Sequence, residues 1–206
     1  MKKLSNLEYE LLEIKRKEFV EKFSIKNIEK MNIDNYILGK GKNNKSFCYL
    51  LEYGLKELGD IRFPTSIKYR IYWSKKKNNF IMLHIYDNNI NKALNDIKHL
   101  LIELIENGAN NDKKSLSILK ESPFYPTVKG KILYLYYPDK YLPIYSKNDL
   151  YLFIEALKIN KKLTGLDEFD LRNILLEYKN KNVKYKDMTM LEFTSLLYEK
   201  YKNKTI

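Results

Sequence analysis

Two carboxylates and a lysine are the residues of this chain whose types come nearest to a catalytic group. Asp139, which follows a proline, and the later Glu177 and Lys179 reproduce the PD…ExK pattern of metal-dependent nucleases. That chemistry needs both carboxylates on adjacent strands, where they reach one magnesium ion. Glu177 instead shares an amphipathic pattern with Ile174 and Leu175, which predicts a helix. A minimal nuclease, which Asp139→Ala would inactivate, is therefore only an alternative hypothesis, and we expect the protein not to cleave DNA.

A second stretch imitates a phosphate-binding loop. Residues 39–46, GKGKNNKS, approach the pattern G-x-x-x-x-G-K-S, but Asn44 replaces the glycine that lets the backbone wrap a phosphate. We therefore interpret the stretch as a loop that leads to Ser46, the N-cap of a helix. The loop still holds three candidate contacts for a DNA phosphate: Lys40, Lys42 and Lys45.

Metal and thiol chemistry has few residues available. The single cysteine, Cys48, excludes an internal disulfide and a cysteine-based zinc site, and we expect it to be a small buried side chain. Of the two histidines, His99 falls on the polar side of a predicted helix. His84 lies in an apolar strand run, where we expect a hydrogen-bonded structural role. We expect no catalytic centre, no metal and no cofactor, and therefore no enzyme.

The charge of the chain favours a phosphate-rich partner. Its 38 Lys and Arg residues exceed its 26 Asp and Glu residues, for a formal net charge of +12. Residues 62–77, RFPTSIKYRIYWSKKK, contain six cations and no acid, so the positive charge is concentrated in one stretch. Enrichment in Lys, Asn, Ile and Tyr is also typical of an AT-rich genome, which leaves genome bias open as another origin of the charge.

Within this stretch the spacing predicts a DNA-binding strand. Lys68, Arg70 and Tyr72 recur with period two and are expected on one face of a strand. Lys75, Lys76 and Lys77 would occupy the tip of the following hairpin, where they could lie along phosphates or enter a groove. The preceding loop adds one more candidate contact, Arg62.

The elements that must position these residues are mostly helical. Amphipathic spacing predicts helices at 4–23, 24–31, 46–58, 91–107, 115–121, 146–157, 167–179 and 190–201. Strands are expected at 67–73 and 79–86, joined by the basic turn SKKKN, and a further strand at 131–137, KILYLYY, which ends at Pro138. The sequence therefore predicts an α+β fold, mostly helical, with a small antiparallel β-sheet that includes a basic hairpin.

We expect a DNA-recognition domain at 1–160 and a helical C-terminal extension at 161–206 packed on it, with a single domain over 1–206 as the alternative. The boundary is placed at 160–165, NKKLTG. No signal peptide and no apolar run of about 18 residues is present, so we expect no membrane partner and a cytoplasmic protein.

Four aromatic residues are candidates for a pocket that holds an extruded base. Tyr72, Trp73, Phe124 and Tyr125 could stack on such a base, although the sequence favours a role in core packing for each of them. The five tyrosines of residues 130–150 are mainly expected in the core.

Four segments carry a resemblance to a known family. They are NYILGKGKNNKSFCYLLE at 35–52, LGDIRFPTSIKYRIYW at 58–73, KGKILYLYYPDKYLPIYSKNDLYLFIEAL at 129–157 and MTMLEFTSLLYEKY at 188–201. In this order they resemble the N-terminal domain that precedes AAA+ modules in McrB-like restriction proteins. The resemblance implies a phage-defence protein that recognises double-stranded DNA, often with a methylated or otherwise modified base. It also implies an AAA+ module in cis and a separate McrC-like nuclease subunit as partners.

Two hypotheses from different classes follow. The first is a non-catalytic DNA-binding specificity domain of a McrB-like restriction system, which recognises a modified base or a specific site. The second is an adaptor that docks a nuclease or another defence protein. It rests on the first helix, whose apolar stripe, Leu4, Leu7, Leu11 and Ile14, could be an interface instead of core.

Overall fold

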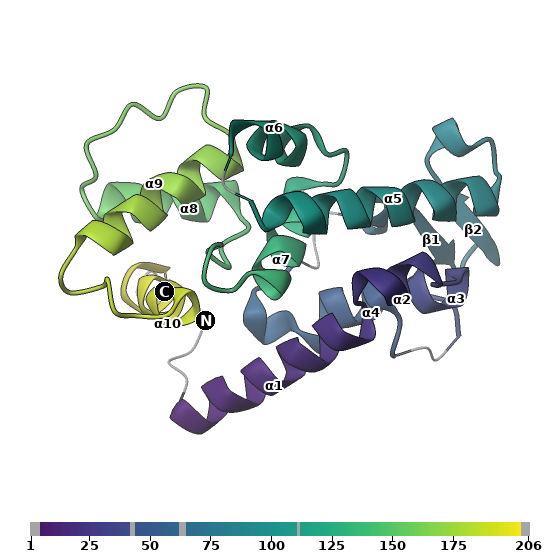
Figure 1. Ribbon diagram of the computed structural model, residues 1–206, viewed down its shortest axis with the longest axis horizontal. Helices are drawn as coiled ribbons and strands as arrows, with labels where there is room; N and C mark the ends of the chain where they lie inside the picture. The colour runs from purple at the N-terminus through teal and green to yellow at the C-terminus, as the bar shows by residue number, and fades with distance from the viewer. Residues whose placement is uncertain (1–4, 42–43, 62–64, 111, 203–206) are drawn as a thin grey trace.

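The computed structural model describes residues 5–41, 44–61, 65–110 and 112–202, and it confirms a mostly helical α+β fold (Figure 1). The α-helices are α1 (Asn6–Lys22), α2 (Ile25–Glu29), α3 (Ile33–Tyr36), α4 (Phe47–Tyr49), α5 (Ile90–Gly108), α6 (Lys113–Glu121), α7 (Pro126–Tyr136), α8 (Lys147–Ala156), α9 (Glu168–Lys181) and α10 (Met190–Leu197). The sheet consists of β1 (Ile71–Ser74) and β2 (Asn79–Met82). Short 3-10 or π turns occupy Leu50–Gly54, Lys56–Leu58, Ser66–Tyr69, His84–Tyr86 and Tyr198–Lys202.

Helix α5 is the longest element and matches its expected range. Asn89 caps its first turn by accepting from the Lys92 amide at 3.0 Å. Its apolar stripe, which includes Leu94, Ile97 and Leu101, is buried against the rest of the core. None of the described helices is long and apolar enough to cross a membrane.

The helix expected at 46–58 is interrupted. Ser46 caps α4 as expected, since its hydroxyl accepts from the Tyr49 amide at 3.3 Å. The chain then widens into a π-helical turn and ends in a 3-10 turn at Gly59. Gly59 ends this turn with a positive φ of 104°, and the buried ammonium of Lys131 donates to the carbonyls of Leu55 and Gly59 at 2.7 and 2.6 Å.

The strand expected at 131–137 is wrong, because these residues form most of α7. Pro126 stands at the first helical position, where its fixed φ and missing N–H fit a helix start. Eight consecutive residues from Val128 to Leu135 are buried. A helix covered on every side has no polar face, so its apolar run cannot be distinguished from a buried strand by periodicity.

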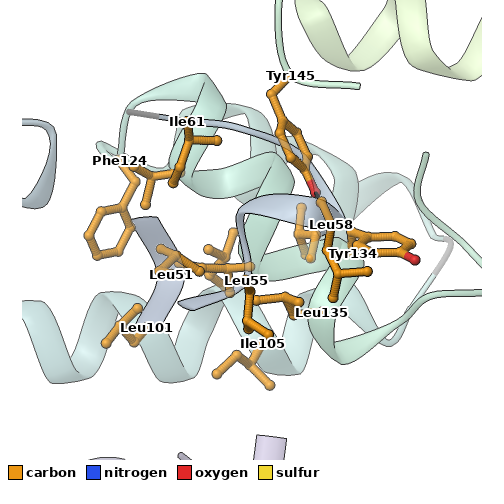
Figure 2. Close-up of a cluster of buried hydrophobic side chains, with 14 of the residues drawn as sticks. Leu51, Leu55, Leu58, Ile61, Leu101, Ile105, Phe124, Tyr134, Leu135 and Tyr145 are labelled. Carbon is orange, nitrogen blue, oxygen red and sulfur yellow. Dashed lines mark hydrogen bonds between the residues drawn. The ribbon is translucent and has the colours of Figure 1, made fainter. Parts of the chain in front are cut away.

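Helix α7 lies near the centre of the molecule (Figure 1) and packs against α1 and α5. Tyr134 and Leu135 of α7 contribute to a buried cluster with Leu55, Leu101 and Ile105 from the preceding half of the chain (Figure 2). The Tyr145 hydroxyl, which follows α7, donates to the Leu58 carbonyl at 3.0 Å. The core is therefore built from segments far apart in the sequence.

The C-terminal helices pack back on this core. Arg172 of α9 is buried and donates to the Ile144 carbonyl at 3.3 Å. Asp149 of α8 accepts from the Tyr198 hydroxyl and from the Lys202 ammonium, each at 2.8 Å. These contacts join residues beyond 161 to the rest of the described chain.

Candidate nucleic-acid interface

The basic hairpin exists, but it is shorter than expected. β1 and β2 pair antiparallel in the register Ile71↔Met82, Tyr72↔Ile81, Trp73↔Phe80 and Ser74↔Asn79. The turn between them is closed by the Lys77 amide, which donates to the Ser74 hydroxyl at 3.3 Å, and by a left-handed Asn78 at φ 47°. Lys75, Lys76 and Lys77 are exposed in this turn, as the sequence predicted.

A loop segment supports the base of the hairpin. The Trp73 amide donates to the Leu38 carbonyl at 2.9 Å. Gly39 allows this approach, because it has a φ of +95° and a Cβ at this position would lie 2.6 Å from the Trp73 carbonyl oxygen. The hairpin is therefore anchored to the segment that carries Lys40.

Aromatic rings and a lysine form one side of the hairpin. Trp73 and Phe80 meet edge to face with their ring centroids 5.0 Å apart. The Lys40 ammonium lies 5.9 Å from the Trp73 centroid and 5.5 Å from the Phe80 centroid, and 2.8 Å from the Asp34 carboxylate. Trp73 and Phe80 are half-buried and pack in part against the hydrophobic core. We call the following set, which includes Tyr72 on the opposite face of β1 from Trp73, the hairpin surface: Lys40, Tyr72, Trp73, Lys75, Lys76, Lys77 and Phe80.

The expectation that Lys68 points outward from a strand is wrong. Residues 66–69 form a 3-10 turn, and the Lys68 side chain is 0% exposed. Its ammonium lies 3.1 Å from a Glu52 carboxylate oxygen and donates to the Ile61 carbonyl. Lys68 is therefore part of a buried ion pair and presents no charge at the surface.

The expectation that Arg70 points outward from a strand is also wrong, because its side chain is buried. Arg70 has a left-handed φ of 70°, which ends the 3-10 turn and starts β1, so residues 67–70 do not follow the strand period. Its guanidinium is buried, where it donates to the Tyr86 hydroxyl and lies 3.2 Å from Asp96. The Tyr86 hydroxyl also donates to Asp96 at 2.6 Å, and burial raises the pKa of Tyr86 to about 12. Arg70 thus links the hairpin to α5.

The remaining cationic candidates divide into two groups. Lys40 and Lys45 are described, and Lys45 is exposed at the entrance to α4, where its carbonyl accepts from the Lys22 ammonium at 2.6 Å. Arg62 and Lys42 lie outside the described residues. Of these four candidates, Lys40 contacts the hairpin, through the rings of Trp73 and Phe80.

The four aromatic candidates do not form a common pocket. Tyr72 and Trp73 belong to the hairpin surface, but Phe124 is 3% exposed and lies in the buried cluster beside Leu51 and Ile61 (Figure 2). Tyr125 is 41% exposed and precedes the first turn of α7. Phe124 is a core residue, so its ring cannot stack on a base.

Several other cations are buried and form hydrogen bonds inside the protein. The buried cationic side chains donate to backbone carbonyls: Arg16 to Leu135, Lys68 to Ile61, Arg70 to Pro123, Lys129 to Leu119 and Lys120, Lys131 to Leu55 and Gly59, Arg172 to Ile144, and Lys179 to Lys186. Only two acidic side chains, Glu52 and Asp149, are buried among the described residues. Part of the +12 charge is therefore internal, and the exposed lysines decide where a polyanion can bind.

The nuclease-like residues do not form a metal site. Glu177 lies on α9 as expected and pairs with Lys181 at 4.0 Å, while Lys179 is buried. Asp139 is exposed in the turn after α7. No group of three His, Cys, Asp or Glu side chains that could hold a metal occurs among the described residues.

The remaining candidates for metal or thiol chemistry are ordinary side chains. Cys48 is buried and His99 is exposed, as expected. His84 is exposed in a 3-10 turn, so its expected place within a strand is wrong. The strand stops at Met82, and the Leu83 amide donates to the Arg70 carbonyl at 3.0 Å before the chain turns toward α5.

Phe80 is a residue of the hairpin surface that the sequence analysis did not identify. A signal was available, because equal steps outward from the turn at 75–78 place Ser74 opposite Asn79 and Trp73 opposite Phe80. The register of a hairpin follows from its turn, so the aromatic pair could have been found by counting.

Comparisons with protein-family models, curated proteins and solved structures returned no match. The resemblance to McrB-like N-terminal domains therefore stays a prediction.

Proposed function

We propose that this chain is a non-catalytic DNA-binding domain that contacts double-stranded DNA through the hairpin surface. The observation that carries the proposal is the exposed turn of Lys75, Lys76 and Lys77 beside the half-buried pair of Trp73 and Phe80. A two-stranded ribbon is narrow enough for the major groove of B-DNA, which is about 12 Å wide. Cations at its tip would meet phosphates, and the aromatic edge would face base edges.

The family resemblance also implies a restriction system in which this domain would act. We propose that the domain selects the DNA target of a McrB-like restriction system in the cytoplasm, with an AAA+ module in cis and a McrC-like nuclease subunit as its partners. Recognition would take place at the hairpin surface without the expected aromatic pocket, because Phe124 is enclosed in the core and Tyr72 and Trp73 point to opposite faces of β1.

A salt titration tests the electrostatic part. Each phosphate neutralised lowers the slope of log K against log salt by about 0.9, so the three tip lysines would contribute about −2.7. The test compares the wild type with Lys75→Glu, Lys76→Glu and Lys77→Glu combined. Fluorescence anisotropy with a duplex of about 20 base pairs at about 50 and about 200 mM salt should show at least a tenfold loss and a shallower slope for the variant.

A matched control separates a local effect from total charge. Lys158, Lys161 and Lys162 are exposed between α8 and α9, at the opposite end of the long axis from the hairpin (Figure 1). Their combined change to Glu alters the formal charge equally and should weaken DNA binding by less than about threefold. Equal losses in both variants would refute the hairpin as the binding site. Methylated and unmethylated duplexes tested in parallel would show whether a modification is read.

A further inference from the structure

A hollow on the other side of the molecule has a chemical character unlike that of the hairpin. It encloses about 630 Å³ between α1, the end of α7 and the start of α10. Figure 1 shows the first turns of α1 and the α10 region on the same side of α7. Its apolar lining comes from four parts of the chain: Ile14, Leu58, Tyr134, and the neighbours Met190 and Leu191. We call it the α1–α10 groove.

An apolar stripe on α1 borders this groove. Leu7, Leu11 and Ile14 are 65%, 49% and 53% exposed, and their spacing places them along one face over two turns, about 10 Å. The core contacts of α1 come from a different face, which includes Leu12 and Phe19. Ile14 belongs both to the stripe and to the groove, so the two form a continuous apolar surface that the described residues leave open.

The groove is acidic in a strongly basic chain. Four carboxylates line it, Glu10, Glu13, Asp139 and Glu192, against two cations, Arg16 and Lys17. Both cations are directed to Glu13, at 2.6 Å from Arg16 and 3.8 Å from Lys17. Glu192 accepts a hydrogen bond from the Thr189 amide at 2.7 Å. The lining therefore carries an excess of negative charge, whereas the whole chain carries +12.

We propose that the α1–α10 groove and the adjoining stripe bind a basic amphipathic helix of a partner protein. Apolar side chains of that helix at positions i, i+4 and i+7 would pack along Leu7, Leu11 and Ile14, and its Lys or Arg residues would face Glu10 and Asp139. A second copy of α1 fits poorly, because it would bring the same carboxylates, Glu10 and Glu13, against each other. DNA is excluded by the same negative charge. The proposal is independent of DNA binding at the hairpin.

Two synthetic peptides test the proposal. Each is about 18 residues long, because shorter peptides are marginally helical in water, and each carries Leu at i, i+4 and i+7 spacing. One has Lys at all polar positions and the other has Glu. Total charge predicts that the acidic peptide binds this +12 chain more tightly. The groove predicts the reverse: the basic peptide should bind at least tenfold more tightly in an anisotropy titration at about 150 mM salt.

Variants at exposed positions locate the binding. Glu10→Lys combined with Asp139→Lys should weaken the basic peptide at least tenfold, and Leu11→Ser should weaken it by removing an apolar contact. The control, Glu103→Lys with Glu106→Lys, makes the same charge change on exposed positions of α5 and should leave the affinity within about twofold. The Lys75–Lys77 variant should bind the basic peptide as the wild type does, even if DNA binding fails.

Three results would overturn the proposal. The first is an acidic peptide that binds as tightly as the basic one, and the second is no binding of the basic peptide at up to about 1 mM. The third is self-association of the wild type in sedimentation equilibrium that Leu11→Ser abolishes, because the stripe would then belong to a second copy of the chain.

Discussion

Buried cations in this protein stabilise the ends of helices and turns. Lys129 of α7 donates to the Leu119 and Lys120 carbonyls in the last turn of α6, and Lys131 donates to the Leu55 and Gly59 carbonyls on either side of the 3-10 turn at 56–58. Lys68 does the same for Ile61 and pairs with Glu52. A lysine is suited to this task, because its flexible stem packs among apolar side chains while its ammonium offers three donors.

The buried pair of Lys68 and Glu52 yields a prediction that separates structure from DNA binding. Lys68→Met should lower the free energy of unfolding by about 3–5 kcal/mol, because it leaves the Glu52 carboxylate buried without its cation. Lys68→Met with Glu52→Leu should recover most of the loss, and this double variant should bind DNA like the wild type. Urea denaturation and anisotropy measure the two quantities. A double variant that folds but binds DNA at least tenfold more weakly would show that Lys68 contributes to DNA binding.

Lys131 predicts a pH dependence of stability. Burial lowers the pKa of its ammonium to about 7 in the folded protein. Above pH 7 the unfolded chain keeps this proton while the folded protein releases it, so stability rises with pH. The rise is at most about 1.4 kcal/mol per pH unit, and below pH 7 both states hold the proton and the contribution is constant.

The comparison with Lys131→Met isolates this contribution. The difference in the free energy of unfolding between wild type and variant should grow in favour of the wild type between about pH 7 and about pH 9. Urea denaturation at several pH values measures it. A difference that stays flat across this window would show that Lys131 remains charged in the folded protein.

At the scale of elements, α7 determines how the rest of the chain packs. It is buried on all sides, and its Gly130 lies against the guanidinium of Arg172 from α9. A Cβ at position 130 would clash with Arg172 Nη1, so α9 can approach only because residue 130 has no side chain.

The effect of Gly130→Ala on stability should therefore be opposite to the effect that helix propensity predicts. In an exposed helix this change stabilises by about 1 kcal/mol, but here it should destabilise the protein, because the buried guanidinium has to move. In an Arg172→Ala background the same change should cost less or become favourable. Thermal or urea unfolding of the four proteins gives the coupling energy. Additive effects of the two changes would contradict the close contact.

At the scale of the whole molecule, the hairpin and the C-terminal helices lie at opposite ends of the long axis (Figure 1). One continuous core joins them, since Leu171 and Phe193 belong to the same buried cluster as Ile71 of β1. The two proposed binding surfaces lie on different parts of this core and differ in charge, which allows DNA and a partner helix to bind together.

The single tryptophan allows a test of this continuity. Trp73 reports on the hairpin, whereas far-UV circular dichroism reports mainly on the helices, including α9 and α10. If the core is shared, the two signals should follow one urea transition with the same midpoint. A tryptophan transition separated from the helical one would show that the chain contains two independently stable units.

Local signals in the sequence were sufficient for much of the fold. Capping residues and apolar periodicity located α5, α8, α9 and α10, and the lysine-rich turn located the hairpin, because all of these depend on residues within a few positions of each other. The fold class and the exposure of Lys75, Lys76 and Lys77 followed from the same information.

Tertiary packing decided the rest. α7 reads as a strand because burial on every side removes the polar face that marks a helix. Lys68 and Arg70 look like surface cations, and their partners Glu52 and Asp96 lie 16 and 26 residues away along the chain. The α1–α10 groove likewise joins segments from both ends of the sequence. Whether a charge faces DNA, a partner or the core depends on contacts between distant segments, which residue types and spacing alone do not contain.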